Sequence, residues 1–221
     1  MKSPGLLFAV SAGSALAYLL SRPITAGDWP VILKVLSILL LALLGFRVHT
    51  LLGMALAISS SGDFLLGVRR LGSRHEESLF LLGLSSFLIA HLVYIALFGR
   101  YRAARWWNLS PMRLLGIIAI LIALSSVLAS VWHSLGSMLI PVVIYSLVLS
   151  CMGISAIFAD LKTPWAALGA LLFIVSDAMI AISKFRSAFP GSEQFIWISY
   201  YSAQCLILRG LACEESQTFR H

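Results

Sequence analysis

The sequence predicts an all-α membrane protein with eight transmembrane helices, in a single polytopic domain that covers residues 1–221. Hydrophobic residues make up 60% of the chain, charged residues only 11%, and the mean hydropathy is +0.95. A soluble domain has about 25% charged residues. The chain also divides into apolar runs of the ~20 residues that a helix needs to cross a bilayer. Eight such runs with short polar connections account for nearly all of its 221 residues.

The first four expected spans lie between short polar or proline-containing segments. They cover about Gly5–Leu20, the stretch after Trp29-Pro30 up to Phe46, Leu51–Val68 and Ser78–Phe98. Proline suits the first turn of a helix, so Pro30 marks the beginning of the second span. Lys2 and the apolar residues behind it resemble a secretory signal peptide. Because seven more spans follow and no soluble domain needs export, we expect an uncleaved first helix.

The last four expected spans follow the strongest basic cluster of the chain. They cover about Pro111–Trp132, Ser137–Phe158, Pro164–Ile182 and Phe195–Leu211. The cluster holds Arg100, Arg102, Arg105 and Arg113, and its neighbours Trp106 and Trp107 are typical of a membrane interface. With the N-terminus inside, nine Lys and Arg fall in inner segments and six in outer ones. Since Lys and Arg favour cytoplasmic loops, we expect both termini in the cytoplasm, in the cell inner membrane if the host is bacterial.

Two aspartates lie deep inside apolar spans. Of the nine acidic residues, only Asp63 and Asp177 lie well within hydrophobic segments. An ionised side chain at the bilayer centre costs roughly 2.5–3.5 kcal/mol even on lenient insertion scales, so we expect the two to be functional. Two carboxyl groups that share a dry site acquire different pKa values, and one can then act as an acid while the other is ionised. The alternative is that each neutralises locally or hydrogen-bonds to a neighbouring helix.

The two Asp-bearing regions look like copies of one unit. Asp63 is followed after 28 residues by His91, and Asp177 is followed after 27 residues by Gln204. Each copy would be a four-helix unit, at about 1–105 and 106–221. Four crossings return the chain to its starting side, so the repeats would be parallel and equivalent residues would lie at equal depth. The sequence therefore predicts a central polar cavity with Asp63 opposite Asp177.

Other polar side chains within the spans are candidates for the lining of that cavity. His91 and Tyr94 share one helix face, and so do Tyr201 and Gln204. These groups could orient the two carboxyls and a substrate. The alternative is hydrogen bonding between helices, which contributes about 0.6 kcal/mol in membrane proteins.

Lys34 and Tyr145 each leave several interpretations open. Lys34 could extend to the membrane interface, bind a lipid phosphate, or pair with an Asp. Tyr145 either faces the same cavity or packs between helices. We expect no metal site, because only His91 among the five histidines is clearly intramembrane and no second His or Cys stands at ligand spacing.

The intramembrane polar residues form a set of short motifs over nearly the whole chain. They are Lys34, Gly62-Asp63-x-x-Leu66, Ala90-His91-x-x-Tyr94, Pro141-x-x-x-Tyr145, Phe173-x-x-Ser176-Asp177 and Tyr200-Tyr201-x-x-Gln204. In this order the set resembles the YhhN-type lysoplasmalogenase family. One departure is that Val35-Leu36-Ser37 follows Lys34, where we would expect a nearby proline.

The resemblance implies an eight-helix membrane hydrolase that cleaves the vinyl ether bond of lysoplasmalogens, which are 1-alkenyl lysophospholipids with choline or ethanolamine headgroups. The products would be a fatty aldehyde and a glycerophospho-base. Asp63 and Asp177 would share acid and base catalysis, with the assignment open, and Lys34 would contact the phosphate. The residues that would position water and glycerol are His91, Tyr94, Tyr145, Tyr200, Tyr201 and Gln204. No metal or cofactor is required, and the expected partners are the lysophospholipid and membrane lipids.

Two other classes of function compete with hydrolysis. A proton-coupled transporter of a small molecule or lipid could use the same Asp pair as a proton relay. Glycine or proline breaks in the middle of matched spans would favour it, and the Asp-bearing spans have no clear break. A structural membrane subunit would leave the two aspartates unexplained. Nucleic acid is not an expected partner, because no basic stripe with interleaved aromatic residues is present.

Overall fold

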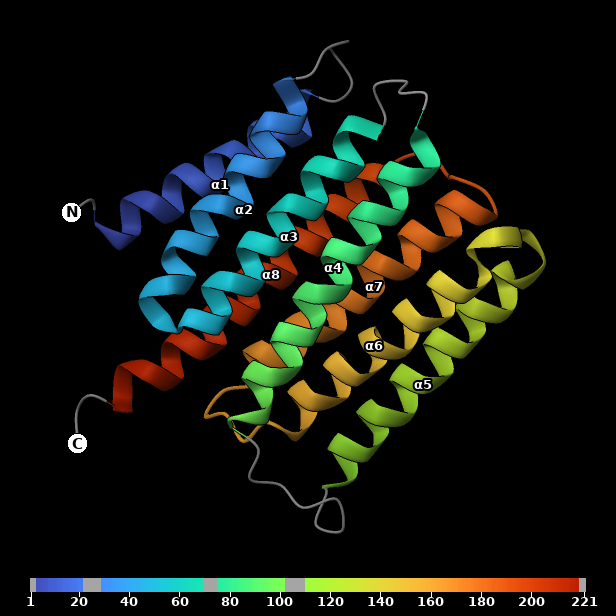
Figure 1. The fold of residues 1–221 in the computed structure, drawn as a ribbon. Coiled ribbons are helices and arrows are strands. Elements are labelled where there is room, and N and C mark those ends of the chain that lie inside the picture. The colour runs from blue at the N-terminus through green and yellow to red at the C-terminus, as the bar shows by residue number, and fades with distance from the viewer. Residues whose placement is uncertain (1–2, 22–28, 70–74, 102–109, 219–221) are drawn as a thin grey trace. The chain divides into compact units, whose positions relative to one another are not determined.

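The computed structural model describes residues 3–21, 29–69, 75–101 and 110–218. These residues form eight α-helices and two short 3₁₀ turns, and they contain no β-strand (Figure 1). The α-helices are α1 (Pro4–Ser21), α2 (Trp29–Val48), α3 (Thr50–Arg69), α4 (Glu76–Gly99), α5 (Pro111–Val131), α6 (Leu139–Phe158), α7 (Trp165–Phe185) and α8 (Ser192–Thr218). The 3₁₀ turns are η2 (Trp132–Ser134) and η3 (Gly136–Met138). The predicted all-α fold is confirmed, with each predicted span on its own helix.

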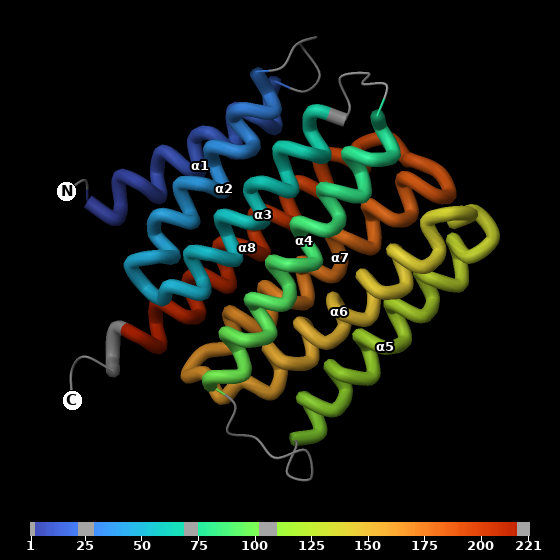
Figure 2. Tube along the Cα trace, viewed as in Figure 1, coloured from blue at the N-terminus to red at the C-terminus, as the bar shows by residue number. Residues whose placement is uncertain are grey.

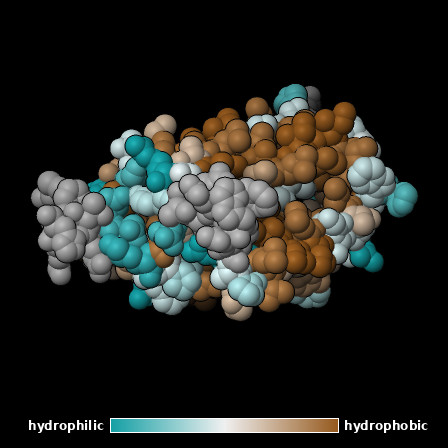
Figure 3. All heavy atoms as spheres, turned by 90° about the horizontal axis from the view of Figure 1, so that it is seen from below, coloured by the Kyte–Doolittle hydropathy of each residue, from teal (hydrophilic) through white to brown (hydrophobic). Residues whose placement is uncertain are grey.

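The surface of the described helices is that of a membrane protein. Seven of them, α1 to α7, are long and apolar enough to cross a bilayer. Large side chains on their surface, such as Ile122 at 61% exposed and Ile140 at 70%, would be unfavourable in water but suit lipid. Figure 3 shows hydrophobic residues over much of the face in view. The chain is therefore a multi-pass integral membrane protein, and its orientation stays a prediction.

Helix α8 differs from the other seven in composition. It is 27 residues long, but it is not among the helices that meet the hydropathy criterion for a span. Polar side chains dilute its apolar stretch, with Tyr200, Tyr201 and Gln204 near its middle and Arg209 further on. A membrane crossing by α8 therefore stays a prediction.

The chain divides into two compact units, and the first, Met1–Tyr94, contains α1 to α3 and most of α4. In this unit α2 packs against both α1 and α3, and the course of these helices can be followed in Figure 2. The Ser11 hydroxyl donates to the Ser37 carbonyl oxygen across α1 and α2, at 2.7 Å. The Ser86 hydroxyl donates to the Ile58 carbonyl oxygen across α4 and α3, at 2.8 Å. Small serines thus bring neighbouring helices close enough for side chain to backbone hydrogen bonds.

The second unit, Ile95–His221, contains α5 to α8. Helix α7 packs against α5, α6 and α8, and α5 packs against α6. The backbones of α7 and α8 approach closely at Gly169, where an added Cβ would lie 2.7 Å from the Ala203 carbonyl oxygen. A side chain of any size at this position would force the two backbones apart.

The boundary between the two units falls within α4, after Tyr94. The repeats predicted from the sequence divide at about residue 105, in a segment outside the described residues. The parallel four-helix repeat and the shared central cavity stay predictions.

Candidate active site

The polar centre of the first unit is an ion pair between α2 and α3. The Lys34 Nζ lies 2.7 Å from the Asp63 Oδ1. Only 1% of the Asp63 side chain and 18% of the Lys34 side chain are exposed. Of the three interpretations of Lys34 that the sequence left open, the structure shows pairing with an Asp. An ammonium at this distance stabilises the charged carboxylate strongly, because little solvent screens the pair.

The local sequence explains how α2 and α3 come close enough to form this pair. The Ser60 hydroxyl donates to the Val35 carbonyl oxygen at 3.1 Å, one residue beyond Lys34 on α2. The Ser37 hydroxyl donates to the Lys34 carbonyl oxygen at 2.7 Å, within an unbroken helix. Helix α2 is therefore continuous past Lys34, where the sequence lacks the proline that we expected. The small side chain of Ser60 allows close approach, and its hydroxyl stays satisfied.

Helix α4 contributes His91 and Tyr94 to the first unit. An added Cβ at Gly62 would lie 2.7 Å from the Phe87 ring, so Phe87 packs directly against α3 beside Asp63. His91 follows Phe87 by one turn, which places it on the same face of α4. Its Nδ1 hydrogen-bonds to the Phe87 carbonyl oxygen, and only 1% of the residue is exposed. A carbonyl oxygen only accepts, so Nδ1 carries a hydrogen, and Nε2 is the acceptor atom when the ring is neutral. Tyr94 is fully buried three residues further on.

The polar centre of the second unit is Asp177 on α7 with Tyr145 on α6. The Tyr145 hydroxyl donates to the Asp177 Oδ2. Tyr145 is 9% exposed and Asp177 8% exposed, so the phenol and the carboxyl are removed from solvent together. Packing between helices alone therefore does not account for Tyr145, because its hydroxyl has a specific acceptor.

Helix α8 packs against α7 and carries a group of aromatic side chains and a buried amide. The Phe173 ring, one turn before Asp177, lies edge-on to the Tyr200 ring with centroids 5.3 Å apart. The Trp197 ring lies 5.8 Å from that of Tyr200 and 5.6 Å from that of Tyr201. Gln204 is fully buried one turn after Tyr200. The predicted residues Tyr200, Tyr201 and Gln204 therefore lie on the helix that packs against the Asp-bearing α7.

The two polar centres follow the same plan. In each unit, a side chain from the preceding helix bonds to the Asp, Lys34 in the first and Tyr145 in the second. In each unit, the Asp-bearing helix also packs against the next helix, which carries His91 or Gln204. This correspondence supports the predicted repeat. The placement of Asp63 opposite Asp177 stays a prediction.

Two residues near these centres were not among the predicted site residues. Phe87 supplies the acceptor for His91, and Trp197 packs on two of the predicted tyrosines. Helical spacing could have indicated both, because Phe87 lies four residues before His91 and Trp197 lies four residues before Tyr201. Within the described parts of the chain, no group of three His, Cys, Asp or Glu could hold a metal ion.

A family model decides which proteins this chain is related to. The model of the YhhN family matches residues 29–211, which include all of the predicted site residues in both units. The chain belongs to the YhhN family. The resemblance stated from the sequence motifs is thereby confirmed.

Relatives of this YhhN protein that are named for an enzymatic activity occur in bacteria and mammals. Proteins of Mycobacterium bovis and Mycobacterium tuberculosis, both named lysoplasmalogenase, are each 35% identical over 158 residues, which is 71% of this chain and 58% of theirs. A Sus scrofa protein named Lysoplasmalogenase TMEM86B is 33% identical over 129 residues, which is 58% of this chain and 52% of its own. The match thus spans little more than half the length of these relatives. No solved structure matches the chain significantly.

Proposed function

We propose that the protein hydrolyses the vinyl ether bond of lysoplasmalogens. The observation that carries the proposal is the presence of two buried carboxyl groups with different partners, Asp63 beside an ammonium and Asp177 beside a phenol. The names of the mycobacterial and mammalian relatives support the same activity. Both carboxyls belong to apolar helices, where a lipid substrate would meet them.

The chemistry of a vinyl ether requires both an acid and a carboxylate. A carboxylic acid gives its proton to the β-carbon of the C=C–O group, which leaves an oxocarbenium ion. Water adds to this cation as the second carboxylate accepts a proton from the water. The resulting hemiacetal breaks its C–O bond, which releases the fatty aldehyde and the glycerol hydroxyl. The second carboxyl gives its proton to the leaving glycerol oxygen, and the first carboxylate takes the hydroxyl proton of the hemiacetal. One water is consumed, and both carboxyls return to their starting forms. The division of labour parallels that of the two carboxyls in glycosidases.

Because Asp63 and Asp177 have different partners, we assign them different roles in this mechanism. Lys34 stabilises the charged form of Asp63, so we assign Asp63 as the carboxylate that stabilises the cation and activates water. Tyr145 is neutral and donates to one oxygen of Asp177. A carboxylic acid can accept that hydrogen bond on its carbonyl oxygen and hold its proton on the other oxygen. We therefore assign Asp177 as the acid that protonates carbon.

The other predicted residues take positioning roles in this mechanism. The acceptor atom of neutral His91 could bind water or the glycerol hydroxyl, and Tyr94 lies on the same helix. In the second unit, Tyr200, Tyr201 and Gln204 would orient the glycerol part of the substrate. Because Lys34 bonds to Asp63, its proposed role is to maintain the charge of that carboxylate. Its contact with the substrate phosphate stays a prediction from the sequence.

The test is aldehyde release from a 1-alkenyl lysophospholipid by the purified protein. We expect Asp63→Asn and Asp177→Asn to lose at least about 100-fold in rate, the usual contribution of a positioned acid or base. Glu76→Gln is the matched control, because Glu76 is exposed in the first turn of α4 and the same change of carboxyl to amide is made there. In deuterated water, the aldehyde should carry one deuterium beside its carbonyl carbon. Folded Asn variants that keep full activity would disprove the mechanism.

Proton-coupled transport stays the alternative for the same pair of aspartates. Transporter sites are often formed by helices that break near mid-membrane. Helices α3 and α7 are continuous through Asp63 and Asp177, which favours hydrolysis. Uptake of a lysophospholipid into proteoliposomes without aldehyde release would reverse this preference.

A further inference from the structure

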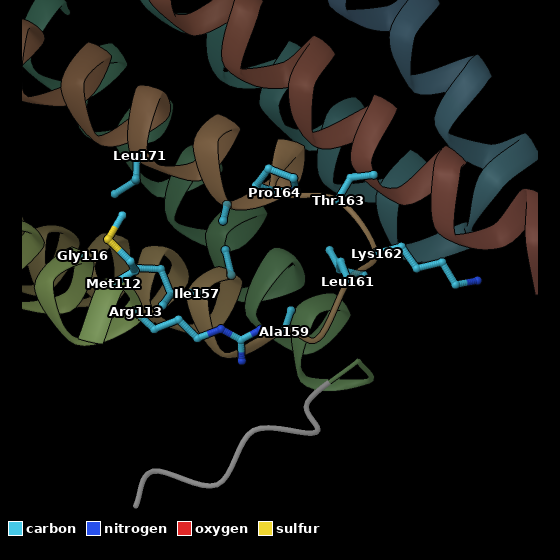
Figure 4. A pocket seen from close by; sticks show the side chains of 12 residues that line it. Met112, Arg113, Gly116, Ile157, Ala159, Leu161, Lys162, Thr163, Pro164 and Leu171 are labelled. Carbon is cyan, nitrogen blue, oxygen red and sulfur yellow. The ribbon is translucent and has the colours of Figure 1, made fainter. Parts of the chain in front are cut away.

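The second unit contains a cavity of about 380 Å³ away from the pair formed by Tyr145 and Asp177. It lies where the beginning of α5, the end of α6 and the turn into α7 meet, and neither of those two residues lines it. Figure 4 shows the Met112 and Leu171 side chains pointing toward each other across it. Asp177 follows Leu171 by six residues, or roughly 9 Å along the helix axis. The cavity is therefore a second site, near the ends of the spans.

One wall of the cavity is apolar and continues onto the lipid-facing side of α5. Met112 is 78% exposed and Leu115 is 61% exposed. Gly116 has no side chain to fill the space, and an added Cβ there would lie 3.1 Å from the Ile157 Cδ1. An acyl chain could thus enter the cavity from the bilayer without leaving an apolar environment. The volume is within the range of small-molecule sites, about 300–1,000 Å³.

An ion pair at the edge of the cavity joins one of its lining cations to a carboxylate just outside the lining. Arg113 lines the cavity, and its Nη2 donates to the Asp160 Oδ1 at 3.2 Å. The Arg113 side chain is 31% exposed and that of Asp160 is 61% exposed, so the anion is the more accessible of the two groups. Such an exposed pair contributes little to stability. Arg113 has five N–H donors and can still bind a phosphate while Asp160 accepts one of them.

Lys162 and Thr163 are the other polar residues of the lining. The Lys162 side chain extends away from the apolar lining in Figure 4, and its Nζ lies 3.7 Å from the Glu214 Oε1. The Thr163 hydroxyl is buried and has no hydrogen-bond partner among the described residues. A buried hydroxyl is costly unless it is satisfied, and a glycerol or ester oxygen of a lipid would satisfy it.

We propose that this cavity binds a membrane phospholipid with a phosphoethanolamine headgroup. The order of charges matches this ligand, because the phosphate of a phospholipid lies next to its glycerol and the ammonium lies further out. The phosphate would bind Arg113, the ammonium would bind Asp160, and part of one acyl chain would occupy the apolar cavity. A carboxylate accepts hydrogen bonds from a primary ammonium, whereas a choline group has no N–H to donate. The site is independent of the proposed hydrolysis.

The test is native mass spectrometry of the full-length protein in detergent, titrated with three diacyl lipids. These are phosphatidylethanolamine, phosphatidylcholine and phosphatidylglycerol. We expect the wild type to prefer phosphatidylethanolamine over each of the others by at least about tenfold, the lower end of what one charge-assisted hydrogen bond supplies. Arg113→Gln should weaken phosphatidylethanolamine binding about tenfold. Arg186→Gln is the matched control, because Arg186 is exposed and lies at the opposite end of α7.

The decisive variant is Asp160→Asn, which removes the negative group and leaves the cation. We expect phosphatidylethanolamine to bind more weakly and phosphatidylglycerol more strongly, so that the preference inverts. An ion pair that serves only stability would shift the melting temperature in both the Arg113 and Asp160 variants without changing lipid preference. That result would overturn the proposal, and so would a protein that binds lysophospholipids but none of the diacyl lipids.

Two cavity-filling variants test the apolar part of the site separately. Gly116→Leu and, independently, Ala167→Leu would occupy the space proposed for the acyl chain. We expect each to lower phosphatidylethanolamine binding at least fivefold, roughly the effect of losing a buried methylene or two, with helicity retained. If both variants fold and bind the lipid like the wild type, the chain does not occupy the cavity and the proposal is wrong.

Discussion

The ion pair between Lys34 and Asp63 allows a quantitative test of the candidate site. Lys34→Met keeps an apolar stem but removes the ammonium, and this leaves a carboxyl with only 1% of its side chain exposed. Removal of one partner of a buried ion pair costs about 3–5 kcal/mol. The carboxyl can escape part of this cost by taking up a proton, which for an ordinary aspartate at neutral pH costs about 4 kcal/mol. We therefore expect the free energy of unfolding to fall by about 3–4 kcal/mol.

A double-mutant cycle separates the ion pair from other effects of the substitution. Asp63→Asn removes the charge with little change of shape, and Lys34→Met combined with it should lose much less than the sum of the two single changes. We expect a coupling of at least about 2 kcal/mol, measured by reversible unfolding in mixed detergent micelles. The exposed pair of Arg113 and Asp160, at 3.2 Å, is the matched control. Its coupling should be below about 1 kcal/mol.

The size of the coupling decides whether Lys34 and Asp63 form a desolvated ion pair. A coupling as small as that of the exposed pair would refute it, and so would a Lys34→Met variant as stable as the wild type.

Two further substitutions test contacts of α7. Tyr145→Phe keeps the ring and removes the donor to Asp177, so we expect a loss of about 1–3 kcal/mol in unfolding free energy, and an unchanged value would contradict the hydrogen bond. Gly169→Ala would place a Cβ 2.7 Å from the Ala203 carbonyl oxygen and should cost about 1–3 kcal/mol by overpacking. Its control is Gly13→Ala on α1, where nothing lies within 4 Å of an added Cβ. There the stability should be unchanged or slightly higher. Equal effects of the two substitutions would contradict the close packing of α7 and α8.

The helices and their bounds follow closely from the sequence. The span predicted at Pro111–Trp132 matches α5 to within one residue at its end, and that predicted at Ser78–Phe98 lies within α4. This agreement has a local cause, because a chain segment in lipid must satisfy its own backbone hydrogen bonds and a helix does so wherever an apolar run is long enough. The exception is α8, which extends beyond the predicted Phe195–Leu211 at both ends into polar residues.

The candidate site was predictable in its members but not in its contacts. The cost of a charge in lipid identified Asp63 and Asp177 from the sequence, since only these two of the nine acidic residues lie well within apolar runs. The partners came from other helices, and hydropathy says nothing about which face of one helix meets another. Lys34 therefore had three interpretations of similar weight, and Tyr145 had two.

The sequence by itself determined the membrane class, the helices and the residues whose charge requires an explanation. Each of these depends on the free energy of transfer of a local segment from water to lipid. The residues of that segment alone set this free energy. The tertiary structure decided that Lys34 bonds to Asp63 and Tyr145 bonds to Asp177, and it formed the cavity beside Arg113. These features depend on how small residues such as Gly62 and Gly169 let particular helix faces approach, and such contacts join residues far apart in the chain.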